Sequence, residues 1–334
     1  MPTILDTKSL YYNDVNLIAS TGTRRVSRGD VPDERWRIIV SPMDSLISEE
    51  LVIEAAKNGI SIFLHRFKNL EWQIDLYRKF YANVINLNQI CSVSLGLKNF
   101  EKDLKILIKE NIKNAGIDIA NGYLDLHKYA ELIPNDYFDT FFVGNIHDES
   151  GFNKLSDIFN HKTNHLMIRV GIGGGSPCSS SDVAGVNRGN ITELIECRKT
   201  KGYNNNVSIL ADGGIKKPGY ASKAFAAGAN FIMLGGYFRS AIEAETNLRG
   251  DGAYWGGASD RQLQIIGQKD KVSEGKVIFK NDNIELKPLS VLVKELWGGL
   301  SSYVTYPGYD SLYQVIGHGV FEVKQNSLPP KDRA

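Results

Sequence analysis

The sequence predicts an α/β protein folded as one (β/α)8 barrel that spans residues 1–334. Short runs of β-branched and aromatic residues recur eight times, at intervals of about 20–35 residues, and helical patterns lie between them. A length of 334 residues is ordinary for such a barrel with insertions. An open, doubly wound sheet is the alternative. It is disfavoured because the chain after the eighth unit does not continue as another strand and helix.

The eight expected strands are mostly continuous apolar runs rather than alternating ones. Continuous runs are typical of parallel strands that are covered on both faces. In chain order, these strands are Ile38–Met43, Ile60–His65, Cys91–Leu97, Gly116–Ala120, Thr140–Ile146, Leu166–Gly171, Val207–Asp212 and Phe231–Gly236.

Helices are expected where apolar residues recur at helical spacing between these strands. Three such segments are Glu49–Lys57, Ile191–Arg198 and Tyr220–Ala227. Pro218 lies just ahead of the third segment and suits a helix start.

The chain beyond the eighth unit differs in character. Residues 248–282 are glycine-rich and then largely polar, and we expect them to form a mobile flap over the active-site mouth. A structureless surface insertion is the alternative. Leu289–Trp297 reads as a helix that begins after Pro288 and ends at Gly298 and Gly299.

The overall charge excludes some classes of partner. The 39 basic and 38 acidic side chains leave a net charge of +1, so no general field attracts nucleic acid or a membrane surface. Any anion must therefore be held by a local site.

Three cysteines, Cys91, Cys178 and Cys197, are too few for a disulfide framework, and no CxxC pair indicates zinc. The first residues do not resemble a signal peptide, and no apolar run approaches the length of a membrane span. We therefore expect a cytoplasmic protein.

Glycine-rich turns follow the last three expected strands, at the end of a barrel where active sites lie. Residues 171–180 read GIGGGSPCSS, Gly213 and Gly214 follow the seventh strand, and Gly235 and Gly236 end the eighth. Backbone N–H groups in such turns can face an anion, and the turns after strands 7 and 8 commonly hold phosphate.

Cys178 lies in the first of these turns, among proline, serine and glycine, with no apolar period around it. This setting favours a nucleophilic thiolate over a buried packing residue. Cys91 and Cys197 lie in an expected strand and helix, and we interpret both as packing residues. Asp212 ends the seventh strand, where it can bind two ribose hydroxyls or cap the next loop.

Other polar residues lie at the ends of earlier strands. Asp118 and Asn121 lie at the end of the fourth strand, and His65 and Arg66 end the second. Each alone could form a structural ion pair, whereas together they would make a polar ring at the barrel mouth.

These motifs resemble the inosine monophosphate dehydrogenase and GMP reductase superfamily. The resemblance covers about residues 14–323 and rests on Ser41–Asp44, Gly171–Cys178, Ala211–Gly214, Ala226–Ala229 and Met233–Gly236. It implies a (β/α)8 barrel, a homotetramer, and a cysteine that attacks C2 of a purine nucleotide monophosphate. The resulting adduct exchanges a hydride with a nicotinamide cofactor.

The resemblance is closest to the reductase branch. Dehydrogenases usually carry a regulatory insertion and an Arg-Tyr pair on the flap, and this chain has neither. Tyr254–Asp260, Ser273–Lys276, Ile117–Tyr123 and Trp297–Leu300 look like reductase segments. The resemblance thus implies NADPH-dependent conversion of GMP to IMP and ammonia through a Cys178 thioimidate. NADH is the alternative cofactor, and K⁺ is expected.

The roles carried over from the family are as follows. The catalytic residues are Cys178, Ser180, Glu274, Asp118 and Arg66. The substrate-binding residues are Ser41, Met43, Ser176, Asp212, Gly214, Gly235, Gly236, Ser273 and Gly275. The cofactor-binding residues are Asn121, Ser302 and Tyr306, and the cation is held by the backbone carbonyls of Gly173, Gly175 and Cys178.

Two further hypotheses stay open. One is an IMP dehydrogenase that oxidises IMP to XMP with NAD. The other is a barrel that binds purine nucleotides without catalysis.

Overall fold

The computed structural model describes residues 8–19, 27–175, 180–200, 202–268, 270, 272–279 and 284–324. Within them, eight parallel strands close into a barrel in which the first barrel strand pairs with the last. The predicted fold class is confirmed. The barrel strands are β2 (Ile38–Val40), β3 (Ser61–Phe63), β4 (Cys91–Leu95), β5 (Asn114–Asp118), β6 (Phe138–Ile146), β7 (Thr163–Val170), β8 (Val207–Asp212) and β9 (Phe231–Leu234).

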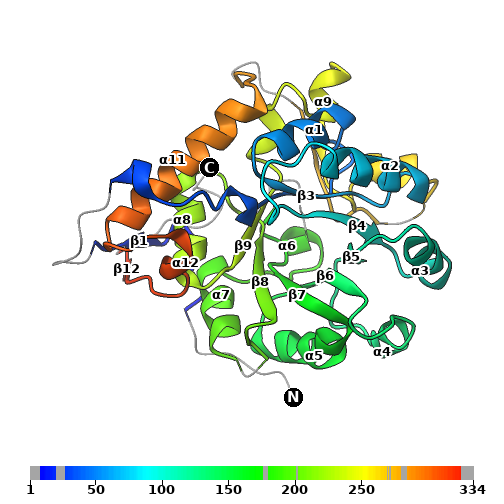
Figure 1. Ribbon diagram of the computed structural model, residues 1–334, viewed down its shortest axis with the longest axis horizontal. Helices are drawn as coiled ribbons and strands as arrows, with labels where there is room; N and C mark the ends of the chain where they lie inside the picture. Colours follow the sequence, from blue (N-terminus) through cyan, green and yellow to red (C-terminus); the bar gives the residue numbers. More distant parts are fainter. Residues whose placement is uncertain are drawn as a thin grey trace.

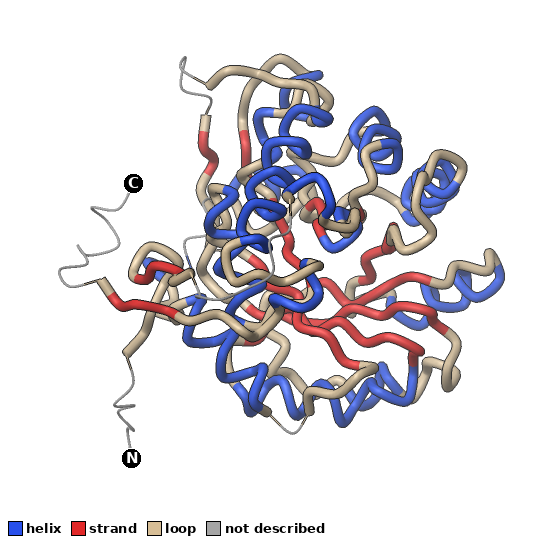
Figure 2. Tube along the Cα trace, turned by 60° about the vertical axis from the view of Figure 1, so that its left-hand side comes forward, coloured by secondary structure: helices blue, strands red, loops and turns tan. Residues whose placement is uncertain are grey.

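Helices surround the barrel and alternate with its strands (Figures 1 and 2). All three helices expected between the strands are present, and Pro218 stands in the first turn of its helix as predicted. The outer helices are α1 (Glu49–Lys57), α2 (Leu70–Tyr81), α3 (Phe100–Lys109), α4 (His127–Ala130), α5 (Glu149–Phe159), α7 (Asn190–Lys199), α8 (Pro218–Ala227) and α11 (Leu289–Thr305).

Large apolar side chains fill the interior of the barrel, so it is a packed core rather than a channel. A second, larger apolar layer lies between the strands and the helices, and it includes Cys91 and Cys197, as expected of packing residues. The interior residues are Ile39, Phe63, Ile90, Phe142, Met167, Leu210, Phe231 and Met233.

The predicted end of the last long helix is wrong. α11 continues through Gly298 and Gly299 to Thr305. A side chain at Gly299 would place its Cβ 2.4 Å from the Cβ of Pro218, whereas Gly298 faces open space. Gly299 therefore lets α11 approach α8 closely. This packing outweighs the weak helix propensity of two glycines.

Smaller elements complete the chain. β1 (Val15–Leu17) pairs with β12 (Phe321–Val323), and β10 (Tyr254–Trp255) pairs with β11 (Val277–Ile278), both antiparallel. The remaining short helices are α6 (Ser180–Val183), α9 (Glu245–Leu248), α10 (Asp260–Ile265), α12 (Leu312–Val315), η1 (Arg28–Asp30), η2 (Arg35–Arg37), η3 (Asn160–Lys162) and η4 (Phe238–Ser240).

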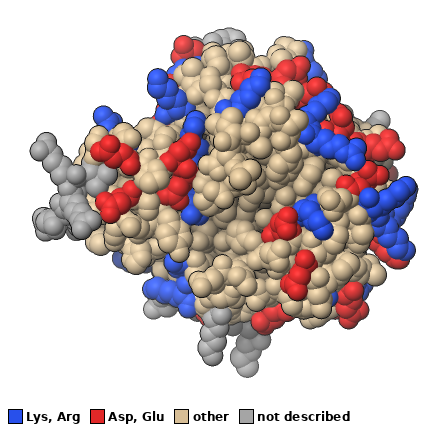
Figure 3. Space-filling model, viewed as in Figure 1, with Lys and Arg blue, Asp and Glu red and all other residues tan. Residues whose placement is uncertain are grey.

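On the face shown in Figure 3, acidic and basic side chains are interspersed, as a net charge of +1 leads one to expect. Within the described ranges, no helix combines the length and the apolar character that crossing a membrane would need.

Candidate active site

A cavity of about 750 Å³ lies at the carboxyl ends of the barrel strands, and we call it the mouth cavity. The structure brings most of the predicted site residues together around it, although they come from six different strand ends and from the predicted flap. The predicted residues that line it are Ser41, Met43, Arg66, Asp118, Asn121, Gly173, Gly175, Asp212, Gly214, Gly235, Gly236, Glu274 and Gly275.

Six predicted residues stand apart from this set, and the sixth, Ser180, is described in the next paragraph. Ser176 and Cys178 lie outside the described residues, so their positions stay predictions. The hydroxyl of Ser273 lies 2.8 Å from the carbonyl oxygen of Gly275, but it does not line the cavity. Ser302 and Tyr306 lie at the end of α11, and neither lines the mouth cavity of this chain.

Ser180 begins α6, and its side chain is not described. Gly175 and Ala184 both line the cavity, so the chain segment that carries Ser180 starts and ends at its wall. His65 differs from the expected polar ring, because its imidazole is fully buried and does not line the cavity.

Arg169 links the two acidic strand ends, and the sequence interpretation missed it. Its guanidinium donates to Asp118 Oδ1 at 2.5 Å and to Asp212 Oδ2 at 2.8 Å. Burial alone would lower the pKa of Arg169, but the two carboxylates outweigh burial and raise it. A charged residue within the apolar run of β7 was the available signal, since such a residue must point at a partner inside the protein.

Hydrogen bonds from two further side chains hold the aspartates on either side of Arg169. Arg66 Nε donates to the backbone carbonyl of Asp118 at 3.0 Å, and Asn145 Nδ2 donates to Asp212 Oδ2 at 2.8 Å. None of the described groups donates a hydrogen bond to Asp212 Oδ1. That oxygen is therefore available for a ligand hydroxyl, which fits the ribose hypothesis better than the alternative of a loop cap.

The glycine turns bring the ends of β7 and β8 into close contact. Gly171 has a φ of +136°, and a Cβ there would lie 2.0 Å from the carbonyl oxygen of Asp212. In the turn after β9, a Cβ at Gly235 would lie 2.5 Å from the Tyr254 hydroxyl and 2.8 Å from Met43 Sδ. Only glycine fits at position 171, and a side chain at position 235 would have to displace Tyr254 and Met43. Backbone groups therefore face the cavity at both turns.

Two polar side chains of α7 stand behind these turns. The Asn190 side chain lies 3.0 Å from the Cβ positions of both Gly174 and Gly214. Asn190 also donates to Glu193 Oε1 at 3.2 Å, whereas Glu193 Oε2 has no hydrogen-bond partner among the described residues. Burial raises the pKa of Glu193 to about 8, so its carboxyl group is mainly protonated at pH 7.

The base of the predicted flap is anchored in the body of the protein. Trp255 is fully buried, and the guanidinium groups of Arg249 and Arg261 lie over its ring, 4.8 and 4.2 Å from the ring centre. Its carbonyl oxygen accepts a hydrogen bond from Ser45 at 3.0 Å. Residues 256–258, 274 and 275 of the flap line the mouth cavity. That the flap is mobile stays a prediction.

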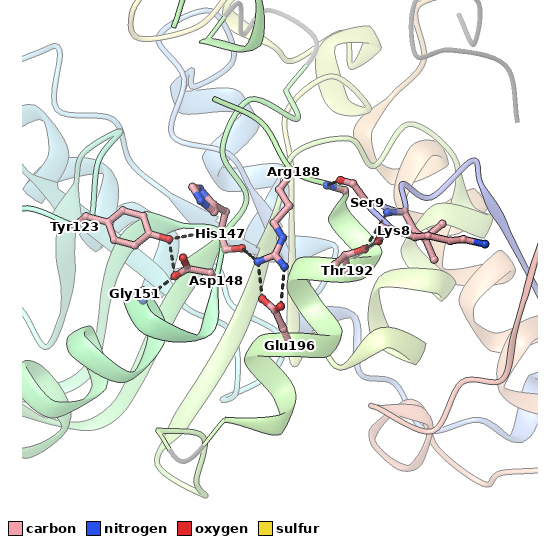
Figure 4. A network of polar contacts seen from close by, with 11 residues as sticks. Lys8, Ser9, Tyr123, His147, Asp148, Gly151, Arg188, Thr192 and Glu196 are labelled. Atoms are coloured by element: carbon pink, nitrogen blue, oxygen red, sulfur yellow. Dashed lines mark hydrogen bonds and ion pairs between the residues drawn. The ribbon is translucent and has the colours of Figure 1, made fainter. Parts of the chain in front are cut away.

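A polar network fixes the loop that follows α6 (Figure 4). Arg188 pairs with both carboxylate oxygens of Glu196 and donates to the backbone carbonyl of His147 at 3.2 Å. The hydroxyl of Tyr123 joins the same region, because it donates to Asp148 and accepts from the backbone N–H of His147. The network therefore ties together the loops after β5, β6 and α6 on one side of the mouth cavity.

Among the described residues, no group of three or more His, Cys, Asp or Glu side chains could hold a metal ion. Asp118 and Asp212 are instead compensated by Arg169. The side-chain chemistry here consequently suits an organic ligand with hydroxyl and anionic groups.

Comparisons with known proteins show the family to which the chain belongs. Residues 35–327 match the family model described as "IMP dehydrogenase / GMP reductase domain". The chain is 27% identical to a GMP reductase of Onchocerca volvulus, over 96% of this chain and 92% of that protein. It is 28% identical to GMP reductase 1 of Homo sapiens, over 85% of this chain and 82% of that protein.

Proposed function

Because this chain belongs to the IMP dehydrogenase / GMP reductase family, we propose that it reduces GMP to IMP and ammonia with NADPH as the electron donor. The mouth cavity carries the proposal. It combines glycine turns at the ends of β8 and β9, an acidic residue with a free oxygen, and a buried cation behind that residue. The names of the similar proteins favour the reductase over the dehydrogenase.

The nucleotide would bind across the ends of β7, β8 and β9. The backbone N–H groups at Gly214, Gly235 and Gly236, with the Ser176 hydroxyl, would hold its phosphate. Asp212 would accept hydrogen bonds from the ribose hydroxyls through Oδ1, while Arg169 keeps its other oxygen in place. The base would then extend toward the segment that carries Cys178. Ser41 and Met43 lie beside Gly235 at the end of the neighbouring strand β2, and they would contact the nucleotide from there. Gly275 and the adjacent Ser273 would contact it from the flap.

The chemistry at C2 of the base is a substitution followed by a reduction. The Cys178 thiolate would add to C2, and the amino group would leave as ammonia, which gives a thioimidate. A hydride then replaces the sulfur at C2, and the thiolate leaves with the bonding electron pair. The balance is one GMP, one reduced cofactor and two protons converted to one IMP, one oxidised cofactor and one ammonium ion.

The protons would come from groups beside the cavity. Glu274 and the Ser180 hydroxyl would deliver a proton to the departing amine. The exposed pair between Lys276 and Asp182, at 2.8 Å, already joins the flap segment of Glu274 to the helix of Ser180. Asp118 and Arg66 would hold the leaving ammonia.

The nicotinamide cofactor would supply the hydride from the other side of the mouth, over the ends of β5 and β6. Asn121 and Asn145 line the cavity there. Asn121 would offer its amide group to a carboxamide or ribose. Asn145 would offer only its carbonyl oxygen, because its Nδ2 already donates to Gly171 and Asp212. K⁺ would bind to the backbone carbonyls of Gly173, Gly175 and Cys178, the first two of which line the same cavity.

Assembly and location are part of the proposal. Ser302 and Tyr306 do not line the mouth of their own chain, so they could contact a cofactor only at the mouth of a second copy. The cofactor and homotetramer proposals therefore depend on each other. We also propose that the enzyme acts in the cytoplasm.

A panel of purine nucleotides with NADPH, NADH, NADP⁺ and NAD⁺ tests this function. We expect oxidation of NADPH only with GMP. A Glu274→Gln variant should lower that rate by at least about 100-fold, as expected for the loss of a general acid. Reduction of NAD⁺ with IMP would indicate the dehydrogenase instead, and nucleotide binding without turnover would indicate the non-catalytic barrel.

A further inference from the structure

The barrel interior is polar at the end where its strands begin. Asn114 of β5, Thr140 of β6 and His165 of β7 are partners in register across three neighbouring strands. Phe142 and Met167, two residues farther along, point into the barrel, so Thr140 and His165 point inward as well. Barrel interiors are normally filled by bulky apolar side chains, and a polar layer here needs an explanation.

A second cavity, of about 670 Å³, lies at this end, and we call it the floor cavity. The volume lies within the usual range of small-molecule sites. Five aromatic residues line it: Trp36, Tyr81, Tyr203, Phe231 and Tyr313.

Among the described residues that line the floor cavity, none is an unpaired cation that could bind an anionic ligand. Its one arginine, Arg37, pairs with Glu34 at 2.6 Å and lies over the ring of Trp36, 4.2 Å from its centre. The carboxylate of Asp139 also lines the cavity. Burial, aided by Arg37, lowers the pKa of His165 to about 4, so its imidazole is neutral at pH 7. An anionic ligand would meet no compensating charge here.

Several polar groups in this cavity keep unused hydrogen-bonding capacity. Asn114 Nδ2 donates to the Tyr81 hydroxyl at 2.9 Å, but among the described residues nothing donates to its Oδ1. The side chains of Thr140, Asn88 and Asn205 also line the cavity, and they make no hydrogen bond to any described residue. Thr140 is only 5% exposed, so its hydroxyl group belongs to the inner wall.

We propose that the floor cavity binds an uncharged purine nucleoside. The aromatic walls would stack on the flat base, the inner amide and hydroxyl groups would bind its polar edge, and the rim amides would bind the ribose. The proposal names a nucleoside rather than a nucleotide, because a phosphate would meet the Asp139 carboxylate and no unpaired cation among the described lining residues. The packed interior separates this site from the mouth cavity, so the inference is independent of the proposed reaction.

Calorimetric titration of the full chain with guanosine and with inosine, with and without excess GMP, tests the proposal. We expect one nucleoside per chain to bind whether or not GMP is present. Asn205→Trp should fill the rim and weaken this binding at least about ten-fold. Asn206→Trp is the matched control, since Asn206 is adjacent but lines a different hollow, and it should leave binding unchanged. Thr140→Val, which removes only a hydroxyl, should weaken binding about five-fold.

Three results would overturn the proposal. The first is no nucleoside binding up to about 10 mM in the presence of GMP. The second is equal weakening by the two tryptophan variants. The third is binding of ribose alone as tight as that of the nucleoside, which would remove the role of the base. A failure of GMP to bind would refute the proposed reaction but would leave the nucleoside titration interpretable.

Discussion

Replacing Glu193 with glutamine should stabilise the protein, and the gain should grow with pH. Glu193 is 1% exposed, and its Oε2 has no hydrogen-bond partner among the described residues. Burial raises its pKa from 4.5 to about 8, against the lowering effects of Asn190 and Arg188. Below pH 4.5 the carboxyl group is protonated in both the folded and unfolded states, so its ionisation does not change the free energy of unfolding.

Between these two pKa values the unfolded chain releases a proton that the folded chain keeps. The free energy of unfolding therefore falls by about 1.4 kcal/mol for each pH unit. Glutamine has nearly the same shape and does not ionise. The stability difference between Glu193→Gln and the parent should thus widen by about 3 kcal/mol from pH 5 to pH 7, and it should level off above pH 8.

Urea unfolding at pH 5, 7 and 9, followed by circular dichroism, measures this difference directly. Glu131→Gln, at an exposed site, is the control for removing one negative charge. Parallel stability curves for Glu193→Gln and the parent across this pH range would refute the reasoning, because they would mean that Glu193 ionises alike in both states.

Three further predictions follow from the site and the packing. Arg169→Met leaves two partly buried carboxylates without their cation, so it should lower the free energy of unfolding in urea by about 2–3 kcal/mol, less than the loss at a fully buried pair. A loss below about 1 kcal/mol would contradict the pairing. Gly299→Ala forces α11 away from α8 and should lower the melting temperature, whereas Gly298→Ala, which faces open space, should raise it slightly. The same direction of change for both would show that Gly299 is not a packing residue. Cys178→Ala should still bind GMP in calorimetry but lose at least about 1,000-fold in turnover, and turnover near the parent rate would exclude the cysteine as nucleophile.

The barrel was predictable because each strand and helix carries its own local signal. Continuous apolar runs identified all eight barrel strands, and helical spacing identified α1, α7 and α8. The end of α11 was not predictable, because a glycine pair that usually ends a helix here serves the contact with α8. That contact joins residues about 80 positions apart and leaves no local trace in the sequence.

The site was predictable where its residues follow strand ends, since the barrel itself gathers those ends. Asp118, Asp212 and the glycine turns belong to this group. Arg169 and Asn145 were missed because they lie within expected strands, where an inward polar residue is recognised only once its partners are known. Glu193 was missed because a glutamate in a helix usually faces solvent. This one lies on the buried side of α7, next to the glycine-rich turn after β7.

The stoichiometry of the reaction tests the central claim most directly. The purified chain is incubated with GMP and NADPH, and cofactor oxidation, ammonium and IMP are measured in the same samples. We predict one ammonium and one IMP for each NADPH oxidised, with none of the three changes in Cys178→Ala. Two results would contradict the proposed substitution at C2. One is oxidation of NADPH without release of ammonium, and the other is release of as much ammonium by the Cys178→Ala variant as by the parent.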